Sequence, residues 1–305
     1  MLLGAHPQAC TVGELRLTNR FDPNSYLCSC GQVLARCDFW NAVTAAMRAR
    51  GADDFSPLDG GTALVNAPDA WSARFLAPLP RGPGMELMRD AALAMSPAWR
   101  RSLRGSRRRV VDLLSVLHEL TGAKVIVDSS KLPLRLKYLL PVREIETRVI
   151  RLIRDGRAVS LTYTDEWSFA DASDPALRGG GTGTRRAPPR GDIAEAAREW
   201  RRSNEAADCV VARLPRDRWL LVRYEDVCAD PQKELRRISE FLGLDPALVT
   251  LNFRSRVQHV IGNGMRLDRT EEIRADERWR LHLSTEDLAG FDRVAGALNR
   301  QYGYA

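Results

Sequence analysis

Residues 148–159 read RVIRLIRDGRAV, and this stretch does most to define the fold. Its first half, RVIRLI, is a short apolar run of the kind that forms a buried strand. Its second half places Arg154, Asp155 and Gly156 at a chain turn, and the sequence predicts a helix from Asp155 onward. A strand that leads directly into a helix is typical of an α/β protein.

Two more predicted strands have the same surroundings. KVIV at residues 124–127 follows a helical apolar pattern that ends at Gly122, and WLLV lies at residues 219–222. Further helices are predicted at residues 132–140, about 193–214, 231–241 and from Ser284, which forms a capping box with Asp287. Strands separated by helices predict a parallel sheet with right-handed crossovers and helices on its faces.

The chain has 305 residues, of which 44% are hydrophobic and 28% charged, so its composition excludes disordered and collagen-like proteins. We expect one domain over residues 1–305, with a flexible loop at residues 174–191, which are rich in Gly, Thr, Pro and Arg.

The sequence shows neither a membrane-spanning apolar run nor a signal peptide, which predicts a cytoplasmic protein with no transmembrane segment. Six scattered cysteines favour reduced thiols over a disulfide framework.

The net charge of +7 indicates a polyanionic partner without identifying it. Ligands of parallel sheets bind at the carboxyl ends of the strands, which here are followed by Asp128-Ser129-Ser130-Lys131 and by Arg154 with the hydroxyls of Ser160 and Thr162. Arginine and a helix N-terminus are suited to bind phosphate. The alternatives are that Asp128 caps a turn and that Arg154 or Arg157 forms a surface ion pair with Asp155.

Four segments in this order resemble one enzyme family. They are VIVDSSK at residues 125–131, RVIRLIRDGRAV at 148–159, LVRYEDVCADPQKELRRISEFLGL at 221–244 and HVIGNGMR at 259–266. The sequence resembles the sulfotransferases that use 3′-phosphoadenosine 5′-phosphosulfate (PAPS), in particular a bacterial branch. The resemblance covers nearly the whole chain, from LLGAHP at residues 2–7 to NRQYGY at 299–304.

The resemblance implies a P-loop-type parallel sheet and transfer of a sulfuryl group from PAPS to a hydroxyl or amine. The acceptor is expected to be a glycan or a small metabolite, and no metal is expected. By the family's motifs, Arg154 and Thr162 hold the 3′-phosphate, with Ser160 as a nearby substitute, and Tyr224 lies near the adenosine. A loop that closes on the nucleotide would contain Gly262, Asn263 and Arg266. Trp200 and Asn204 match a further motif of the branch, for which we expect core packing.

The transfer needs a general base and a cation near the bridging oxygen. At the position where related enzymes place a His or Glu, this chain has Asp128, and the nearest cation is Lys131. His259 is the second candidate base.

The resemblance also implies a difference at the N-terminus. Family members begin with a strand and a Gly- and Ser/Thr-rich loop around the 5′-phosphosulfate, and LLGAHP follows on the next helix. This chain begins at Met1 inside that helix, so we expect either a start codon upstream or a truncated product, and we favour the former. The 305-residue chain is then expected to bind the nucleotide weakly and to turn over little.

Two other features bear on the acceptor. Cys28, Cys30 and Cys37, with Cys10 as a possible fourth ligand, could hold a structural metal, but their spacing is not the paired CxxC that zinc sites prefer. The resemblance suggests that residues 20–105 form a helical, cysteine-containing insertion over the acceptor pocket. Six arginines at residues 100–109 are expected on a solvated helix face, and would favour an anionic acceptor if they faced the cleft.

Two alternative functions have less support. A kinase-like phosphotransferase should have a G-x-x-x-x-G-K-[ST] motif, which the sequence lacks. A basic nucleic-acid-binding protein would need stacking or reading residues, but aromatic residues make up only 7% of the chain and we find no reading motif, so no nucleic-acid partner is expected.

Overall fold

The computed structural model describes residues 1–16, 22–76, 83–164, 172, 174–181, 191–268 and 270–304. The chain divides into two compact units. Unit 1 contains Met1–His6, Arg148–Arg256 and Asn263–Ala305, and unit 2 contains Pro7–Thr147 and Val257–Gly262. Both units are therefore assembled from separate segments of the sequence.

The strands of unit 2 are β1 (Ala9–Thr11) and β2 (Val125–Val127), which pair in parallel with Ala9 opposite Val125. Just beyond β1, Gly13 forms a parallel bridge with Ile261. Gly13 has a φ of +93°, and a Cβ there would lie 2.0 Å from the Ile261 carbonyl oxygen. Only glycine therefore permits the residue-261 segment to approach this closely.

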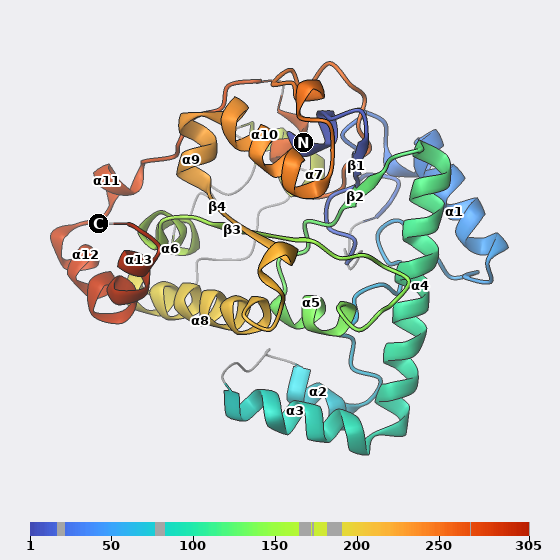
Figure 1. Cartoon of the computed structure of the whole chain (residues 1–305), viewed down its shortest axis with the longest axis horizontal. Helices are drawn as coiled ribbons and strands as arrows, with labels where there is room; N and C mark the ends of the chain where they lie inside the picture. Colours follow the sequence, from blue (N-terminus) through green and yellow to red (C-terminus); the bar gives the residue numbers. More distant parts are fainter. Residues whose placement is uncertain are drawn as a thin grey trace. The chain divides into compact units, whose positions relative to one another are not determined.

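The long helix of unit 2 is α4 (Pro97–Thr121), which has a defined start and end. The Ser96 side chain accepts a hydrogen bond from the Trp99 N–H at its start, and Gly122 ends it in the left-handed conformation. In Figure 1, α1 lies beside one end of α4 and α3 joins the other end. The helices of this unit are η2 (Leu34–Arg36), α1 (Asp38–Ala49), α2 (Ala70–Leu76), α3 (Pro83–Met95), α4 (Pro97–Thr121) and α5 (Pro133–Leu139).

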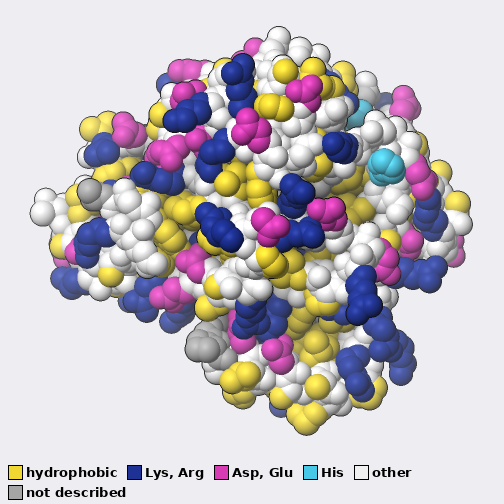
Figure 2. All heavy atoms as spheres, in the orientation of Figure 1, with side chains coloured by type: hydrophobic (Ala, Val, Ile, Leu, Met, Phe, Trp, Pro, Cys, Tyr) yellow, Lys and Arg dark blue, Asp and Glu magenta, His cyan; other side chains and the backbone are white. Residues whose placement is uncertain are grey.

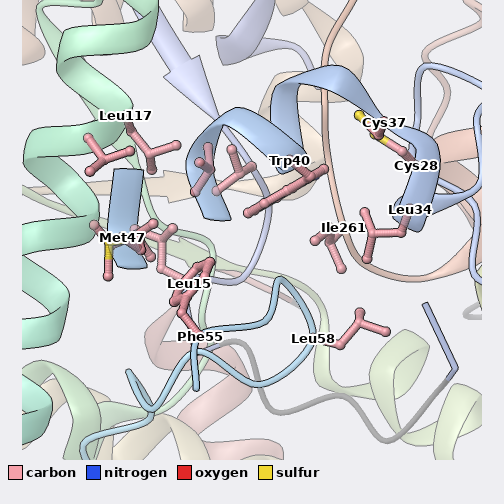
Figure 3. Packing of buried hydrophobic residues seen from close by; sticks show 14 of the residues in the cluster. Leu15, Cys28, Leu34, Cys37, Trp40, Met47, Phe55, Leu58, Leu117 and Ile261 are labelled. Atoms are coloured by element: carbon pink, nitrogen blue, oxygen red, sulfur yellow. The ribbon is translucent and has the colours of Figure 1, made fainter. Parts of the chain in front are cut away.

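The main core of unit 2 lies between α1 and α4. Trp40 and Met47 of α1 and Leu117 of α4 are fully buried there, together with Leu15 and Phe55 from the connecting segments. Figure 3 shows this cluster, with Cys28 and Cys37 at its edge near Trp40. The apolar face of α1 is thus covered within the unit.

Unit 1 is built around β3 (Val149–Ile153) and β4 (Trp219–Arg223), which pair in parallel along their whole length. Helix α6 (Gly156–Thr164) follows β3 and packs on α8 (Ile193–Val211). The helices of unit 1 are η1 (Leu3–Ala5), α6 (Gly156–Thr164), η3 (Pro175–Leu177), α7 (Arg178–Gly181), α8 (Ile193–Val211), η4 (Arg216–Arg218), α9 (Tyr224–Ala229), α10 (Pro231–Leu242), η5 (Pro246–Leu248), η6 (Gly264–Leu267), α11 (Trp279–His282), α12 (Thr285–Phe291), η7 (Asp292–Gly296, a π-helical segment) and α13 (Ala297–Gln301).

The first turn of α6 is tightly packed. A Cβ at Gly156 would lie 2.6 Å from the Phe291 ring and 2.9 Å from the Trp200 ring. Trp200 is buried, as expected, and the Asn204 amide donates to the Trp200 carbonyl. The glycine of the RDG segment is therefore a packing requirement, and Trp200 and Asn204 belong to the core.

The structure confirms the α/β class, the three predicted strands and the capping box between Ser284 and Asp287. It adds β1, which the sequence analysis did not predict. Among the described residues, the strands form two parallel pairs, β1–β2 and β3–β4. Whether residues 1–305 form a single domain stays a prediction.

The expected flexible loop is only partly within the described residues. Pro175–Leu177 and Arg178–Gly181 form short helical turns, so regular structure is present where the composition had suggested none. Residues 182–190 lie outside the described part of the chain. No helix in the described ranges combines the length and the apolar character needed to cross a membrane.

Candidate functional site

Arg154 follows the carboxyl end of β3 in unit 1. Its Nη2 donates to Asp276 Oδ2 at 2.9 Å, and its guanidinium lies 4.8 Å from the centroid of the Tyr224 ring. Its Nε is buried and has no hydrogen-bond partner among the described residues. An unpartnered buried donor of a cation is costly, so this atom is a candidate for contact with an anion.

Asp276, the ion-pair partner of Arg154, was not identified from the sequence. Arg278 donates to both of its carboxylate oxygens at 2.7 Å. Hydrogen bonds from Arg278 and then from Arg154 hold the pKa of Asp276 well below its usual range. In the sequence, Asp276 lies between Arg274 and Arg278, and this pattern is too common to indicate a functional residue.

The hydroxyls of α6 differ in their surroundings. Ser160 Oγ is buried and has no partner within the described part of the chain. Thr162 Oγ1 instead donates to the Val159 carbonyl at 2.7 Å. Of the two candidates for the 3′-phosphate, Ser160 therefore has the freer hydroxyl, although the family motif favoured Thr162.

The N-terminus of α6 is already occupied by protein groups. The Gly156 N–H donates to Asn299 Oδ1, and the Arg157 N–H donates to Asp155 Oδ1, both at 2.9 Å. Asp155 and Arg157 also form the local ion pair that the sequence left open as an alternative. Any phosphate contact at this end of β3 therefore depends on side chains more than on free backbone N–H groups.

Tyr224 begins α9, directly after β4. Its hydroxyl donates to the Arg274 carbonyl at 3.1 Å and accepts from the Asp276 N–H at 3.2 Å. Burial, followed by contact with Cys228, raises the pKa of Tyr224 to about 12, so it is a neutral phenol at pH 7. The residue thus positions the 274–276 segment and presents its ring to Arg154.

The GN-x-x-R segment forms a short turn. Asn263 is exposed and precedes η6, while Arg266 is buried and its Nη1 donates to the Asn263 carbonyl at 2.7 Å. In unit 2, the Gly262 N–H donates to the Tyr26 hydroxyl at 3.0 Å. The guanidinium of Arg266 thus stabilises the turn that begins at Asn263.

Asp128 follows β2 in unit 2 and accepts several hydrogen bonds. Its Oδ1 accepts from the N–H groups of Leu15 and Ser130, and its Oδ2 accepts from Nη2 of Arg135 at 3.0 Å. Arg135 is only 2% exposed and also donates to the Thr62 carbonyl. Both carboxylate oxygens are therefore engaged, Oδ1 by backbone N–H groups and Oδ2 by Arg135, a buried arginine that the sequence did not indicate.

The rest of the DSSK segment has similar roles. Ser130 Oγ accepts from the Arg16 N–H at 3.1 Å, and Lys131 is exposed and pairs with Glu14. The N-cap of α5 is Leu132, so neither Asp128 nor Ser130 caps that helix. Asp128 Oδ1 does accept from the Ser130 N–H at 2.9 Å, which is the capped turn that the sequence left open as an alternative. The side chains of Asp128 and Ser130 also accept hydrogen bonds from the backbone N–H groups of Leu15 and Arg16, and so hold that segment in place. The catalytic assignment of Asp128 and Lys131 stays a prediction.

His259 lies beside cysteines of the 28–37 segment. Its Nδ1 is 3.3 Å from Cys37 Sγ and 3.8 Å from Cys28 Sγ. Cys30 Sγ is 3.7 Å from Cys37 Sγ, whereas Cys10 lies on β1 and is not part of this group. Sequence spacing alone could not reveal this cluster, because His259 is 222 residues beyond Cys37.

The arginine-rich part of α4 lines a hollow in unit 2. The hollow has a volume of about 420 Å³ and is bordered by Asp90 and Leu93 of α3 and by Arg100, Arg104 and Arg107 of α4. Figure 2 shows Lys and Arg side chains gathered over this part of α4. Arg109 is paired with Asp54 at 2.6 Å and so contributes less to the local positive charge.

Comparisons with known proteins agree with the motifs. Mouse carbohydrate sulfotransferase 5 is 31% identical over 175 residues, which are 54% of this chain and 44% of that protein. Mouse carbohydrate sulfotransferase 1 is 28% identical over 184 residues, which are 55% of this chain and 41% of that protein. The chain thus spans less than half the length of these curated relatives.

Two solved structures also resemble the chain distantly. The sulfotransferase domain from the curacin biosynthetic pathway has a TM-score of 0.41 and 14% identity, and the alignment covers 97% of both chains. The sulfotransferase domain of the Synechococcus PCC 7002 olefin synthase also has a TM-score of 0.41, with 19% identity over 97% of this chain and 94% of that one. The sequence model described as the sulfotransferase family matches residues 1–247, and the chain therefore belongs to that family.

Proposed function

We propose that this protein transfers a sulfuryl group from PAPS to a hydroxyl group of a carbohydrate acceptor. Membership of the sulfotransferase family supports sulfuryl transfer over the kinase-like and nucleic-acid-binding alternatives. The nucleotide donor is supported by the chemistry at the end of β3. The acceptor class is supported by the names of the two mouse relatives.

The observation that carries the donor assignment is the presence of two buried polar atoms without partners after β3. Arg154 Nε and Ser160 Oγ lack hydrogen-bond partners among the described residues. Bound phosphate oxygens would provide acceptors for such donors, and a charged acceptor makes the bonds stronger. We therefore assign Arg154 and Ser160 to the 3′-phosphate, with Thr162, Tyr224, Gly262, Asn263 and Arg266 as the further predicted nucleotide residues.

In the reaction, an acceptor oxygen attacks the sulfur atom and the bond from sulfur to the 5′-phosphate oxygen breaks. The acceptor gives up its proton to a base, and adenosine 3′,5′-bisphosphate leaves with the negative charge. Asp128 and His259 are the base candidates from the sequence. The contacts of Asp128 favour a positioning role for it, because both of its oxygens already accept hydrogen bonds from the protein.

The hollow beside α4 supports an acceptor that carries negative charge. Arg100 and Arg104 are exposed there, and neither forms an ion pair with an acid among the described residues. Acidic carbohydrates offer carboxylates or sulfates to guanidinium groups. An anionic oligosaccharide is thus the preferred substrate class.

Isothermal titration calorimetry with adenosine 3′,5′-bisphosphate tests the donor assignment. Ser160→Ala is expected to weaken binding about tenfold or more, because it removes a hydrogen bond to a charged group. Adenosine 5′-monophosphate is the control ligand, since it lacks the 3′-phosphate and its affinity should not change. Equal affinities of the wild type and Ser160→Ala for the bisphosphate would contradict the assignment.

Transfer of radiolabelled sulfate from PAPS to acidic and neutral oligosaccharides tests the acceptor class. Arg104→Glu is expected to reduce transfer to the acidic acceptors while leaving bisphosphate binding unchanged. Arg236→Glu on α10 is the control, because Arg236 is also an exposed arginine but lies outside the hollow. Sulfation that is equally fast with neutral acceptors and unaffected by Arg104→Glu would exclude the anionic class.

A further inference from the structure

Three cysteines and one histidine of unit 2 converge on a single point. The Sγ atoms of Cys28, Cys30 and Cys37 and a ring nitrogen of His259 all lie within 4.8 Å of one another. Cys28 and Cys37 are completely buried, whereas Cys30 and His259 are half-buried. Figure 3 shows the side chains of Cys28 and Cys37 next to each other at the edge of the core.

The distances within this group match those of a tetrahedral metal centre. A zinc ion with Zn–S bonds of about 2.3 Å and a Zn–N bond of about 2.0 Å separates two sulfurs by about 3.8 Å and a sulfur from the nitrogen by about 3.5 Å. The observed separations are 3.7 Å for Cys30–Cys37, 3.8 Å for Cys28–His259 and 3.3 Å for Cys37–His259. A disulfide would instead need two sulfurs about 2.0 Å apart, and all described cysteines are free.

The backbone that carries the ligands is held in place. The chain turns back between Cys28 and Gln32, with the Gly31 N–H donating to the Cys28 carbonyl and the Cys28 N–H donating to the Gln32 carbonyl, both at 2.9 Å. Gly31 has a φ of +88°, a value that favours glycine. This tight turn allows a CxC pair to direct both thiols to one point.

The position of His259 is fixed by contacts of the histidine itself and of the residue that follows it. Its carbonyl accepts from Trp40 Nε1 at 3.1 Å, and its ring stacks on Phe39 with 4.5 Å between ring centroids. The next residue, Val260, donates its N–H to Ser29 Oγ at 2.8 Å. Such support of ligand residues by their neighbours is typical of preorganised metal sites.

We propose that Cys28, Cys30, Cys37 and His259 bind one structural zinc ion, with His259 coordinating through Nδ1. Three thiolates and one imidazole form a ligand set suited to zinc. Since all four positions are filled by protein groups, the ion has no open position for a substrate and acts in folding. This inference does not depend on the proposed sulfuryl transfer, and it assigns His259 to the metal instead of to base catalysis.

The ion would join two segments that are far apart in the sequence. Cys28, Cys30 and Cys37 belong to the N-terminal part of unit 2, and His259 belongs to its returning segment Val257–Gly262. That segment also pairs with Gly13 through Ile261. Zinc binding would therefore stabilise the return of the chain to unit 2.

Elemental analysis of the full chain, purified without a metal-affinity tag, is the first test. The wild type is expected to contain about one zinc per chain. Cys30→Ser should lose most of it, because it removes one of the four ligands. Cys30 is the most exposed of the three thiols, so its replacement disturbs the core least. Cys209→Ser is the matched control, because Cys209 is exposed on α8 and lies outside the group. Absence of zinc from the wild type, or equal zinc in Cys30→Ser, would overturn the proposal.

Alkylation of the wild-type protein provides a second test that needs no variant. Cys28, Cys30 and Cys37 should resist N-ethylmaleimide until a zinc chelator is added, whereas Cys209 should react at once. The chelator should also lower the melting temperature, and added zinc should restore it. Unchanged alkylation and melting after chelation, or a Cys30–Cys37 disulfide in the purified protein, would exclude the site.

Discussion

Asp128 and Arg135 form an ion pair in which one partner is buried. Removing the negative charge of Asp128 leaves the guanidinium of Arg135, which is 2% exposed, without its counter-charge. We expect Asp128→Asn to lower the free energy of unfolding by about 3 kcal/mol or more. Urea denaturation followed by fluorescence measures this change.

Glu14→Gln is the control for that experiment. It breaks the pair of Glu14 with Lys131, which is exposed, so its cost should stay below about 1 kcal/mol. A variant Asp128→Asn that keeps wild-type stability but loses turnover would instead support Asp128 as the catalytic base.

Gly156 supports a prediction from packing alone. Gly156→Ala would place its Cβ 2.6 Å from the Phe291 ring, and we expect this crowding to cost about 1–3 kcal/mol. Gly105→Ala on α4 meets no atom within 4 Å and should stabilise the protein by about 0.5–1 kcal/mol. Thermal melts of both variants give the comparison, and a stable Gly156→Ala protein would contradict the packing argument.

Asp276 predicts a pH dependence of stability. Its pKa is lowered in the folded protein, so its stabilising effect is complete above the pKa of an unfolded aspartate, about 3.9, and decreases as the pH falls below it. Asp276→Asn should therefore be less stable than the wild type at pH 7, with a smaller difference at pH 3. Urea midpoints at both pH values test this, and an equal difference at both would exclude the ion pair as its cause.

At the scale of residues, the sequence indicated which residues follow the strands, but not which side chains they contact across the fold. The motifs pointed to Arg154 and Thr162, with Ser160 as a nearby substitute. Arg154 Nε and Ser160 Oγ lack partners among the described residues, whereas Thr162 donates to the Val159 carbonyl. Asp276 and Arg135 could not be found in this way, because a single charged residue carries no local signal of the partner it meets across the fold. Likewise, the CxC spacing argued against a metal, whereas the fold brings His259 to the thiols.

Secondary-structure elements were predictable where several local signals agreed. Strands β2, β3 and β4 are short β-branched or apolar runs between helices, and α10 begins at Pro231 and ends before Gly243. β1 has only three residues, Ala9–Thr11, and it exists because it pairs with β2. Such a strand is defined by a long-range contact and leaves no periodic pattern.

The capping box of α12 supports a prediction at this scale. The Ser284 hydroxyl accepts from the Asp287 N–H at 3.1 Å, and the Ser284 N–H donates to the Asp287 carboxylate at 3.0 Å. Ser284→Ala should cost about 1 kcal/mol, since an N–H of the first turn loses its acceptor. Thr285→Ala, at the next exposed position, should have little effect in the same melting assay, and equal losses would rule out the cap as the cause.

For the molecule as a whole, net charge supports a prediction about polyanions. With 46 basic and 39 acidic side chains, the protein should bind heparin at low salt and elute as salt screens the interaction. The double variant with Arg100→Glu and Arg104→Glu should elute at lower salt than the double variant with Arg202→Glu and Arg236→Glu. The second variant is the control, because it changes the net charge by the same amount but on unit 1. Identical elution would show that the α4 arginines form no preferred surface.

The interleaving of the two units has a consequence for synthesis on the ribosome. Unit 2 needs Val257–Gly262, and unit 1 needs Met1–His6, so neither unit is complete until most of the polypeptide has left the exit tunnel. Early-emerging residues such as Gly13 and Tyr26 must wait for their partners Ile261 and Gly262, which lengthens the period in which this part of unit 2 is open to chaperones. For the same reason, no single cut in the gene yields either unit intact.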